Sequence, residues 1–117
     1  MNSDLKRELE ALTGAYYGEA PEGAKYPYMV FSAQRLSDDD GKQIYSLEIN
    51  AWDQHEFYSR VESMMDALEK KLHRCNYMTD KFLIRIFRGR IQNIPDPDKT
   101  IKRIREQFEM QVFEKEM

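Results

Sequence analysis

The stretch that decides the fold is YPYMVFSAQRLSDDDGKQIYSLEINAWD, residues 26–53. Its first part alternates side chains with the period of two that is typical of a β-strand. The acidic run that follows ends in Asp40-Gly41, a dipeptide that strongly indicates a tight hairpin turn. The return strand alternates again, and its apolar face consists of Tyr45, Leu47, Ile49 and Ala51. We therefore expect a β-hairpin with one packed face and one wetter face.

A helix is expected directly after this hairpin, over residues 53–72. Asp53 is in position to cap it, and Glu56 three residues later completes a capping-box pattern. The buried stripe of this helix is expected to consist of Phe57, Val61, Met64, Leu68 and Leu72. This is the long helix of the predicted domain.

Elements on either side complete the predicted fold. Leu5, Leu9 and Leu12 recur at helical spacing and indicate a short N-terminal helix. Residues 82–88 alternate as a strand. Residues 101–116 also alternate, which favours a strand, although the spacing of their apolar residues and their composition also fit a helix. The predicted fold class is α+β, with a small antiparallel sheet of about four strands packed against the long helix and the short N-terminal helix. Residues 1–117 form a single domain.

The bulk properties narrow the function classes. The net charge of −3 argues against binding nucleic acid by general electrostatics, because neutralising phosphates requires a basic face. The one cysteine, Cys75, permits no intramolecular disulfide and favours a reducing compartment such as a cytoplasm. No apolar run approaches the ~20 residues that a membrane span needs, so we expect no membrane partner.

The sequence offers little material for catalysis. His55 and His73 lie at opposite ends of the expected long helix, and Cys75 near His73 lacks a third, orienting group. Phosphate-binding glycine loops, C-x-x-C pairs and nucleophile elbows are missing from the sequence. We therefore expect no enzyme activity, no catalytic residues and no cofactor.

The acidic turn is the one candidate for a metal site. Asp38, Asp39 and Asp40 offer carboxylate oxygens, the ligands that Mg²⁺ and Ca²⁺ prefer. The turn lacks the alternating ligands and the closing glutamate of an EF-hand loop. A weak divalent cation such as Mg²⁺ is therefore the most that this pattern indicates, and a solvated turn is the simpler interpretation.

The order of these elements resembles the tail terminator, or tail-to-head joining, proteins of long-tailed bacteriophages, which are also called tail completion or minor tail proteins. The resemblance covers residues 26 to about 113. The segments that carry it are YPYMVF at 26–31, the acidic hairpin, YSLEINAWD at 45–53, YSRVESMMDALEKKL at 58–72 and the IPDPD loop at 94–98.

This resemblance implies a structural virion protein of a phage or prophage that caps the tail tube and joins tail to head. Family members form rings, commonly hexamers, so the implied partners are further copies of the chain, the tail tube protein and the head-completion or connector protein. DNA would pass through the ring without specific binding. The implied location is the virion tail, and the host cytoplasm during assembly. In some members divalent cations promote the ring, which again points to Asp38, Asp39 and Asp40.

Ring closure needs complementary surfaces on the two sides of each copy. Tyr45, Trp52 and Phe113 are the candidate interface residues, because they are apolar groups that exceed the needs of a small core. Two other interpretations remain open. One is a small bacterial adaptor domain that binds a protein partner without catalysis. The other is a small metal-dependent hydrolase or nuclease that uses the acidic loops.

Overall fold

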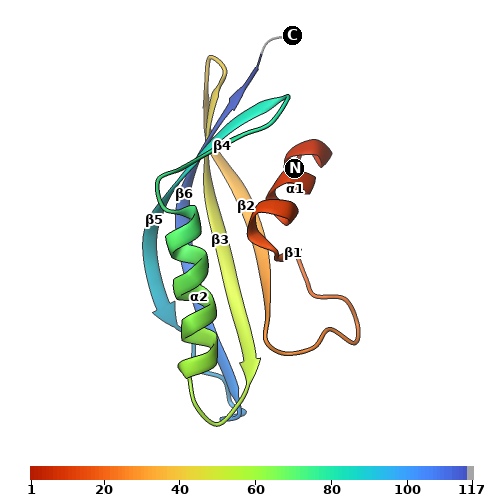
Figure 1. The fold of residues 1–117 in the computed structure, drawn as a ribbon, viewed down its shortest axis with the longest axis vertical. Coiled ribbons are helices and arrows are strands. Elements are labelled where there is room, and N and C mark those ends of the chain that lie inside the picture. Colours follow the sequence, from red (N-terminus) through yellow and green to blue (C-terminus); the bar gives the residue numbers. More distant parts are fainter. Residues whose placement is uncertain (116–117) are drawn as a thin grey trace.

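Half of the chain is strand in the computed structural model, which describes residues 1–115 (Figure 1). In chain order the elements are α1 (Ser3–Thr13), β1 (Tyr16–Tyr17), β2 (Tyr28–Asp39), β3 (Lys42–Gln54), α2 (Ser59–Leu72), β4 (Cys75–Met78), β5 (Phe82–Asn93) and β6 (Ile101–Glu114). The strands form one sheet in the order β1-β2-β3-β6-β5-β4, which curls into half of a barrel. Every neighbouring pair is antiparallel except β1 with β2.

The predicted α+β fold class, with about four strands packed against a long helix, is wrong. The sheet has six strands, and the helices have only 11 and 14 residues. The strands β1 and β4 lie outside the strands predicted from the sequence. Strands of two and four residues carry no detectable alternation, and they form because the edge of a longer strand offers them hydrogen bonds.

The predicted hairpin is confirmed. Strands β2 and β3 pair from Tyr28–Trp52 to Asp39–Lys42 and are joined by the two-residue turn Asp40-Gly41. Both turn residues have positive φ angles, 50° and 93°, as a type I′ turn requires. This conformation explains why the second residue is glycine, because a Cβ atom is strained there.

The helix α2 begins six residues later than predicted, because the strand β3 continues through Gln54. Asp53 is therefore a strand residue, and the predicted cap is wrong. Its side chain lies on the same face as Ile49 and Ala51 and is fully buried. Phe57, expected in the buried stripe, is 60% exposed, and the stripe that the helix buries consists of Val61, Met65, Leu68 and Leu72.

The core lies between the sheet and the two helices, both of which lie on one face of it (Figure 1). Leu5, Leu9 and Leu12 of α1 are buried there, as their spacing predicts. Asn2 caps this helix, since its Oδ1 accepts hydrogen bonds from the amides of Asp4 and Leu5 at 2.8 and 3.2 Å. Neither helix of the described chain is long and apolar enough to cross a membrane.

The C-terminal segment forms the strand β6 at the centre of the sheet, paired with β3 on one side and β5 on the other. Its strand interpretation is confirmed, while Glu116, the last residue of the predicted segment, lies outside the described residues. A bulge interrupts the β5–β6 register between Phe87 and Arg90. Gly89 lies inside it, where an added Cβ atom would overlap the backbone oxygen of Gln107.

Candidate functional site

The second face of the sheet is the candidate site, because no element of residues 1–115 covers it (Figure 1). Side chains of a strand alternate between the two faces, so the partners of this face follow from the register. Trp52 lies opposite Arg103, and Asn50 lies opposite Arg105. We call this surface the open face.

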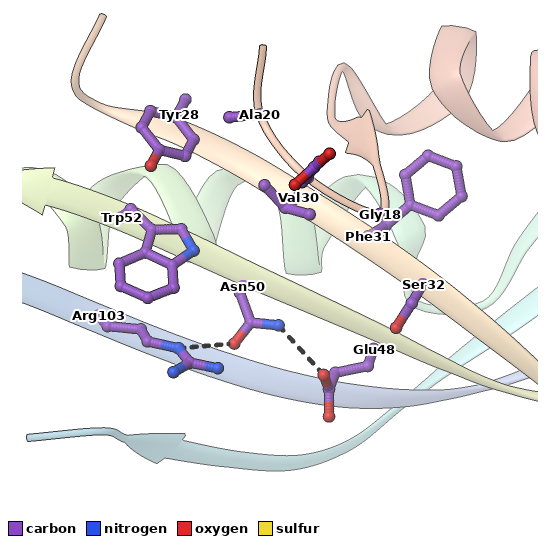
Figure 2. A pocket seen from close by; sticks show the side chains of 11 residues that line it. Gly18, Ala20, Tyr28, Val30, Phe31, Ser32, Glu48, Asn50, Trp52 and Arg103 are labelled. Atoms are coloured by element: carbon purple, nitrogen blue, oxygen red, sulfur yellow. Dashed lines mark hydrogen bonds between the residues drawn. The ribbon is translucent and has the colours of Figure 1, made fainter. Parts of the chain in front are cut away.

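A chain of polar contacts runs across the open face, as Figure 2 shows. The Nε of Arg103 donates to Oδ1 of Asn50 at 2.9 Å, and Nδ2 of Asn50 donates to Oε2 of Glu48 at 3.2 Å. Arg105 forms an ion pair with Glu48 at 3.8 Å. The guanidinium of Arg103 also lies 4.5 Å from the ring centre of Trp52, a cation–π distance. These lateral contacts hold long side chains flat against the sheet.

A shallow pocket of about 460 Å³ opens on this face next to the loop after β1. Glu19 and Ala20 line it from the loop. Tyr28, Trp52 and Arg103 line it from the sheet, as Figure 2 shows. The pocket contains a single arginine, and its one serine, Ser32, lies opposite Glu48 with no hydrogen bond between their side chains within residues 1–115. Its lining suits a polar protein surface better than a reacting substrate.

The open face carries more basic than acidic side chains, although the whole chain is acidic. Its basic members are Lys42, Arg85, Arg90, Arg103 and Arg105, and its acidic members are Asp39, Glu48 and Glu109. Most of these cations are engaged by neighbours on the face: Lys42 lies over the ring of Phe113, and Arg85 lies over that of Phe87. The excess of positive charge makes this face the electrostatically distinct side of the molecule.

The predicted interface residues do not form one patch. Trp52 and Phe113 both lie partly exposed on the open face, at opposite ends of the β3–β6 ladder. Tyr45 belongs to the helix-covered face and is only 7% exposed, and its hydroxyl donates to Oε1 of Gln43. Trp52 and Phe113 can therefore touch a partner directly, whereas Tyr45 contributes to the core.

The predicted metal residues lie at the tip of the β2–β3 hairpin. Asp38 and Asp39 end β2 and point to opposite faces, while Asp40 is in the turn. Asp38 forms an ion pair with Arg35 at 3.8 Å. Within residues 1–115, no group of three histidine, cysteine, aspartate or glutamate side chains has the arrangement to hold a metal ion. Cation binding at this tip stays a prediction.

A buried acid on β6 was not predicted from the sequence. Glu106 is fully buried beneath α2, and neither of its carboxylate oxygens has a hydrogen-bond partner in the described chain. Burial first, and then the neighbouring carboxylate of Glu69, raise the pKa of Glu106 to about 8. Its position in the apolar alternation of β6 is the one signal that could have revealed it.

Both margins of the sheet leave backbone unpaired. The short β1 covers β2 only at Val30 and Phe31, and the short β4 covers β5 only from Leu83 to Ile86. Residues 32–39 of β2 and residues 89–93 of β5 therefore have a neighbouring strand on one side only within the described chain. Unpaired strand edges are places where another chain can add by hydrogen bonding.

The comparisons with known proteins agree with a structural role. A chain from the "Virion of native gene transfer agent (GTA) particle" has a similar fold, with a TM-score of 0.69 and 18% identity over 92% of this chain and 84% of that chain. No curated protein matches significantly. The family model of the tail completion protein gp17 matches residues 5–112, which confirms the resemblance seen in the sequence. The chain therefore belongs to the tail completion protein gp17 family, whose members are structural proteins of the virion tail.

Proposed function

We propose that this protein completes the phage tail as a ring of identical copies, which caps the tail tube and provides the surface that joins tail to head. The observation that carries the proposal is the family match over residues 5–112. A hexamer is the expected ring, as the sequence resemblance implies. The protein acts by assembly, and no catalytic step is assigned to it.

The shape of the molecule supports this role. It extends 50 × 27 × 21 Å, because four of its strands have 12 to 14 residues and run along its length. A half-barrel with helices on one face and a polar open face can form a segment of a larger closed wall. Heterologous contacts between two different sides of each copy generate such a ring.

The partners in this proposal are the tail tube protein on one side of the ring and a head-completion or connector protein on the other. DNA passes through without specific binding. Two contacts on the open face support the absence of specific DNA binding. Asn50 already accepts a hydrogen bond from Arg103, and Glu48 already forms an ion pair with Arg105. A surface built for tight phosphate binding would instead leave several cations free to project.

Light scattering on a sizing column, over a range of protein concentrations and with isolated tail tubes added, tests the ring. The proposal expects a species about six times 14.0 kDa, either from the protein alone or bound to the tubes. A monomer under every condition, tubes included, would contradict it. The same series with and without Mg²⁺ tests whether the carboxylates of Asp38, Asp39 and Asp40 bind a cation that promotes assembly.

A further inference from the structure

We propose that neighbouring copies join edge to edge, with residues 32–39 of β2 from one copy pairing antiparallel with residues 89–93 of β5 from the next. This inference rests on the proposed ring and names the surfaces that close it. It starts from the two unpaired margins, which lie on opposite sides of the same sheet.

Strand direction favours this pairing. Between the two margins lie four strands, β2-β3-β6-β5, and each pair among them is antiparallel. Strands β2 and β5 therefore run in opposite directions. When copies are related by rotation about an axis roughly along the strands, β2 of the next copy arrives antiparallel to β5. The alternation then continues from copy to copy without interruption.

The two edges are complementary in charge. Residues 34–40 of the β2 edge contain Asp38, Asp39 and Asp40 against one basic residue, Arg35. The β5 edge instead carries the exposed side chains of Arg90 and of Arg88, which also forms an ion pair with Glu69 of α2 at 3.6 Å. Antiparallel pairing brings the acidic end of β2 next to the start of the free β5 segment, where these arginines lie. Opposite charges placed across neighbouring strands stabilise the pairing, and like charges oppose it.

Each edge also exposes one large aliphatic side chain. Leu36 of β2 is 62% exposed and Ile91 of β5 is 47% exposed, and both lie near the middle of the free segments. Ile91 lies opposite Glu106 and therefore on the helix-covered face, whereas Leu36 is the extra residue of a bulge in β2 between Arg35 and Ser37. The same antiparallel pairing therefore places Ile91 beside Arg35, whose ladder partner Tyr45 lies on that face. The amide of Arg88 already donates to Nδ1 of His73 at 2.9 Å, so the free backbone of β5 begins at Gly89.

The heights of the two segments on the sheet fit a closed wall. The middle of the β2 segment, at Arg35, is level with Met110 of β6, and Ile91 is level with Glu106. Along the strand direction, the middles of the two free segments differ in height by about four residues, or roughly 13 Å. Each copy adds four strand spacings to the wall, three within the copy and one across the contact, which total roughly 19 Å. The strands would then tilt by about 35° from the ring axis, which is the tilt that closed barrels adopt.

Cysteine cross-linking tests the pairing. Cys75 is the one native cysteine and is replaced first, by Cys75→Ala. In that background we expect Arg35→Cys with Ile91→Cys to give, under mild oxidation, a ladder of multimers that ends at the ring size. Each single variant should give no ladder. The control pair Arg35→Cys with Phe57→Cys, whose second position is also exposed, should give none.

A charge exchange gives a second readout that does not depend on cysteines. Asp38→Lys/Asp39→Lys alone and Arg90→Glu alone should each lose the ring, because every interface then joins like charges. A 1:1 mixture should recover it, since alternating copies meet through one native and one reversed interface.

A cross-linked dimer from either single-cysteine variant would overturn the head-to-tail pairing. If the double-cysteine variant forms a ring of full mass but gives no ladder, the pairing of β2 with β5 is wrong, whereas the proposed ring still stands. Failure of the unmodified protein to form any ring would overturn the proposed function and this inference together.

Discussion

The buried carboxylate of Asp53 accepts two hydrogen bonds from Arg60, seven residues later in the chain. Nε of Arg60 lies 2.8 Å from Oδ2, and a terminal nitrogen lies 2.5 Å from Oδ1. This bidentate pair connects the end of β3 to the first turn of α2 and bridges the irregular segment between them. The hydrogen bonds from Arg60 hold the pKa of Asp53 below its usual range.

Arg60→Leu should destabilise the fold by about 2 kcal/mol, because it leaves the fully buried carboxylate of Asp53 without its partner. Asp53→Asn should cost less, since the half-exposed Arg60 can turn to water. A depressed folded pKa contributes stability above the unfolded pKa of about 3.9 and loses it as the pH falls below that value. Urea unfolding at pH 7 and pH 3 measures both effects. Equal losses for both variants at pH 7 would contradict the asymmetry.

Glu106→Gln should stabilise the protein at alkaline pH. The folded pKa of Glu106, about 8, lies above its unfolded value of about 4.3, so the native state holds more protons between these limits. The free energy of unfolding should therefore fall as the pH rises from about 4.3 to 8 and stay low above that. The carboxylates of Glu69 and Asp66 from α2 strengthen this effect, and Arg88 from β5 opposes it.

Denaturant midpoints at pH 5.5 and pH 9 test this dependence. The gain in Glu106→Gln over the unmodified protein should reach the order of 2 kcal/mol at pH 9 and shrink toward pH 5.5. Glu109→Gln, on the same strand but exposed, is the matched control and should show no such change. A gain that is independent of pH would count against a neutral, buried Glu106.

Gly89→Ala should destabilise the sheet by about 2 kcal/mol or more, because the new methyl group overlaps the Gln107 backbone within the β5–β6 bulge. Gly23→Ala is the control. Its Cβ atom meets open space, so only the cost of a left-handed backbone, about 1 kcal/mol, should appear. Thermal unfolding of both variants compares them, and a milder effect at position 89 than at position 23 would refute the close packing of the bulge.

The stacking of Arg103 on Trp52 should be measurable as a coupling energy. A double-mutant cycle with Trp52→Ala and Arg103→Gln should return about 0.5–1 kcal/mol, since the pair lies on a partly exposed face. Chemical denaturation of the four proteins supplies the values. A coupling of zero would mean that the two side chains do not interact in solution.

Local patterns in the sequence predicted local structure well. The Asp40-Gly41 turn and the alternating side chains of β3 could both be predicted from the sequence, because a hairpin is specified by residues that are close together along the chain. The cap at Asp53 failed for a physical reason. Burial of its side chain beside Ala51 and pairing of its backbone with β6 extend the strand, and these long-range contacts outweigh a capping pattern.

The site was much less predictable. The hydrogen bond between Arg103 and Asn50 depends on the β3–β6 register, which joins residues about fifty positions apart in sequence. The sequence indicated Trp52 as a surplus apolar residue, but it did not indicate that Arg103 stacks on its ring. The free edges were equally hidden, because they exist only where β1 and β4 stop short of their longer neighbours.

Electron microscopy of finished and unfinished tails tests whether this protein closes the end of the tail as a ring. Tails assembled without this protein should lack density at the end of the tube that meets the head, and adding the purified protein should restore a closed ring there. We expect six copies per ring at that end. Tails that are complete without the protein, or a protein bound elsewhere on the particle, would contradict it.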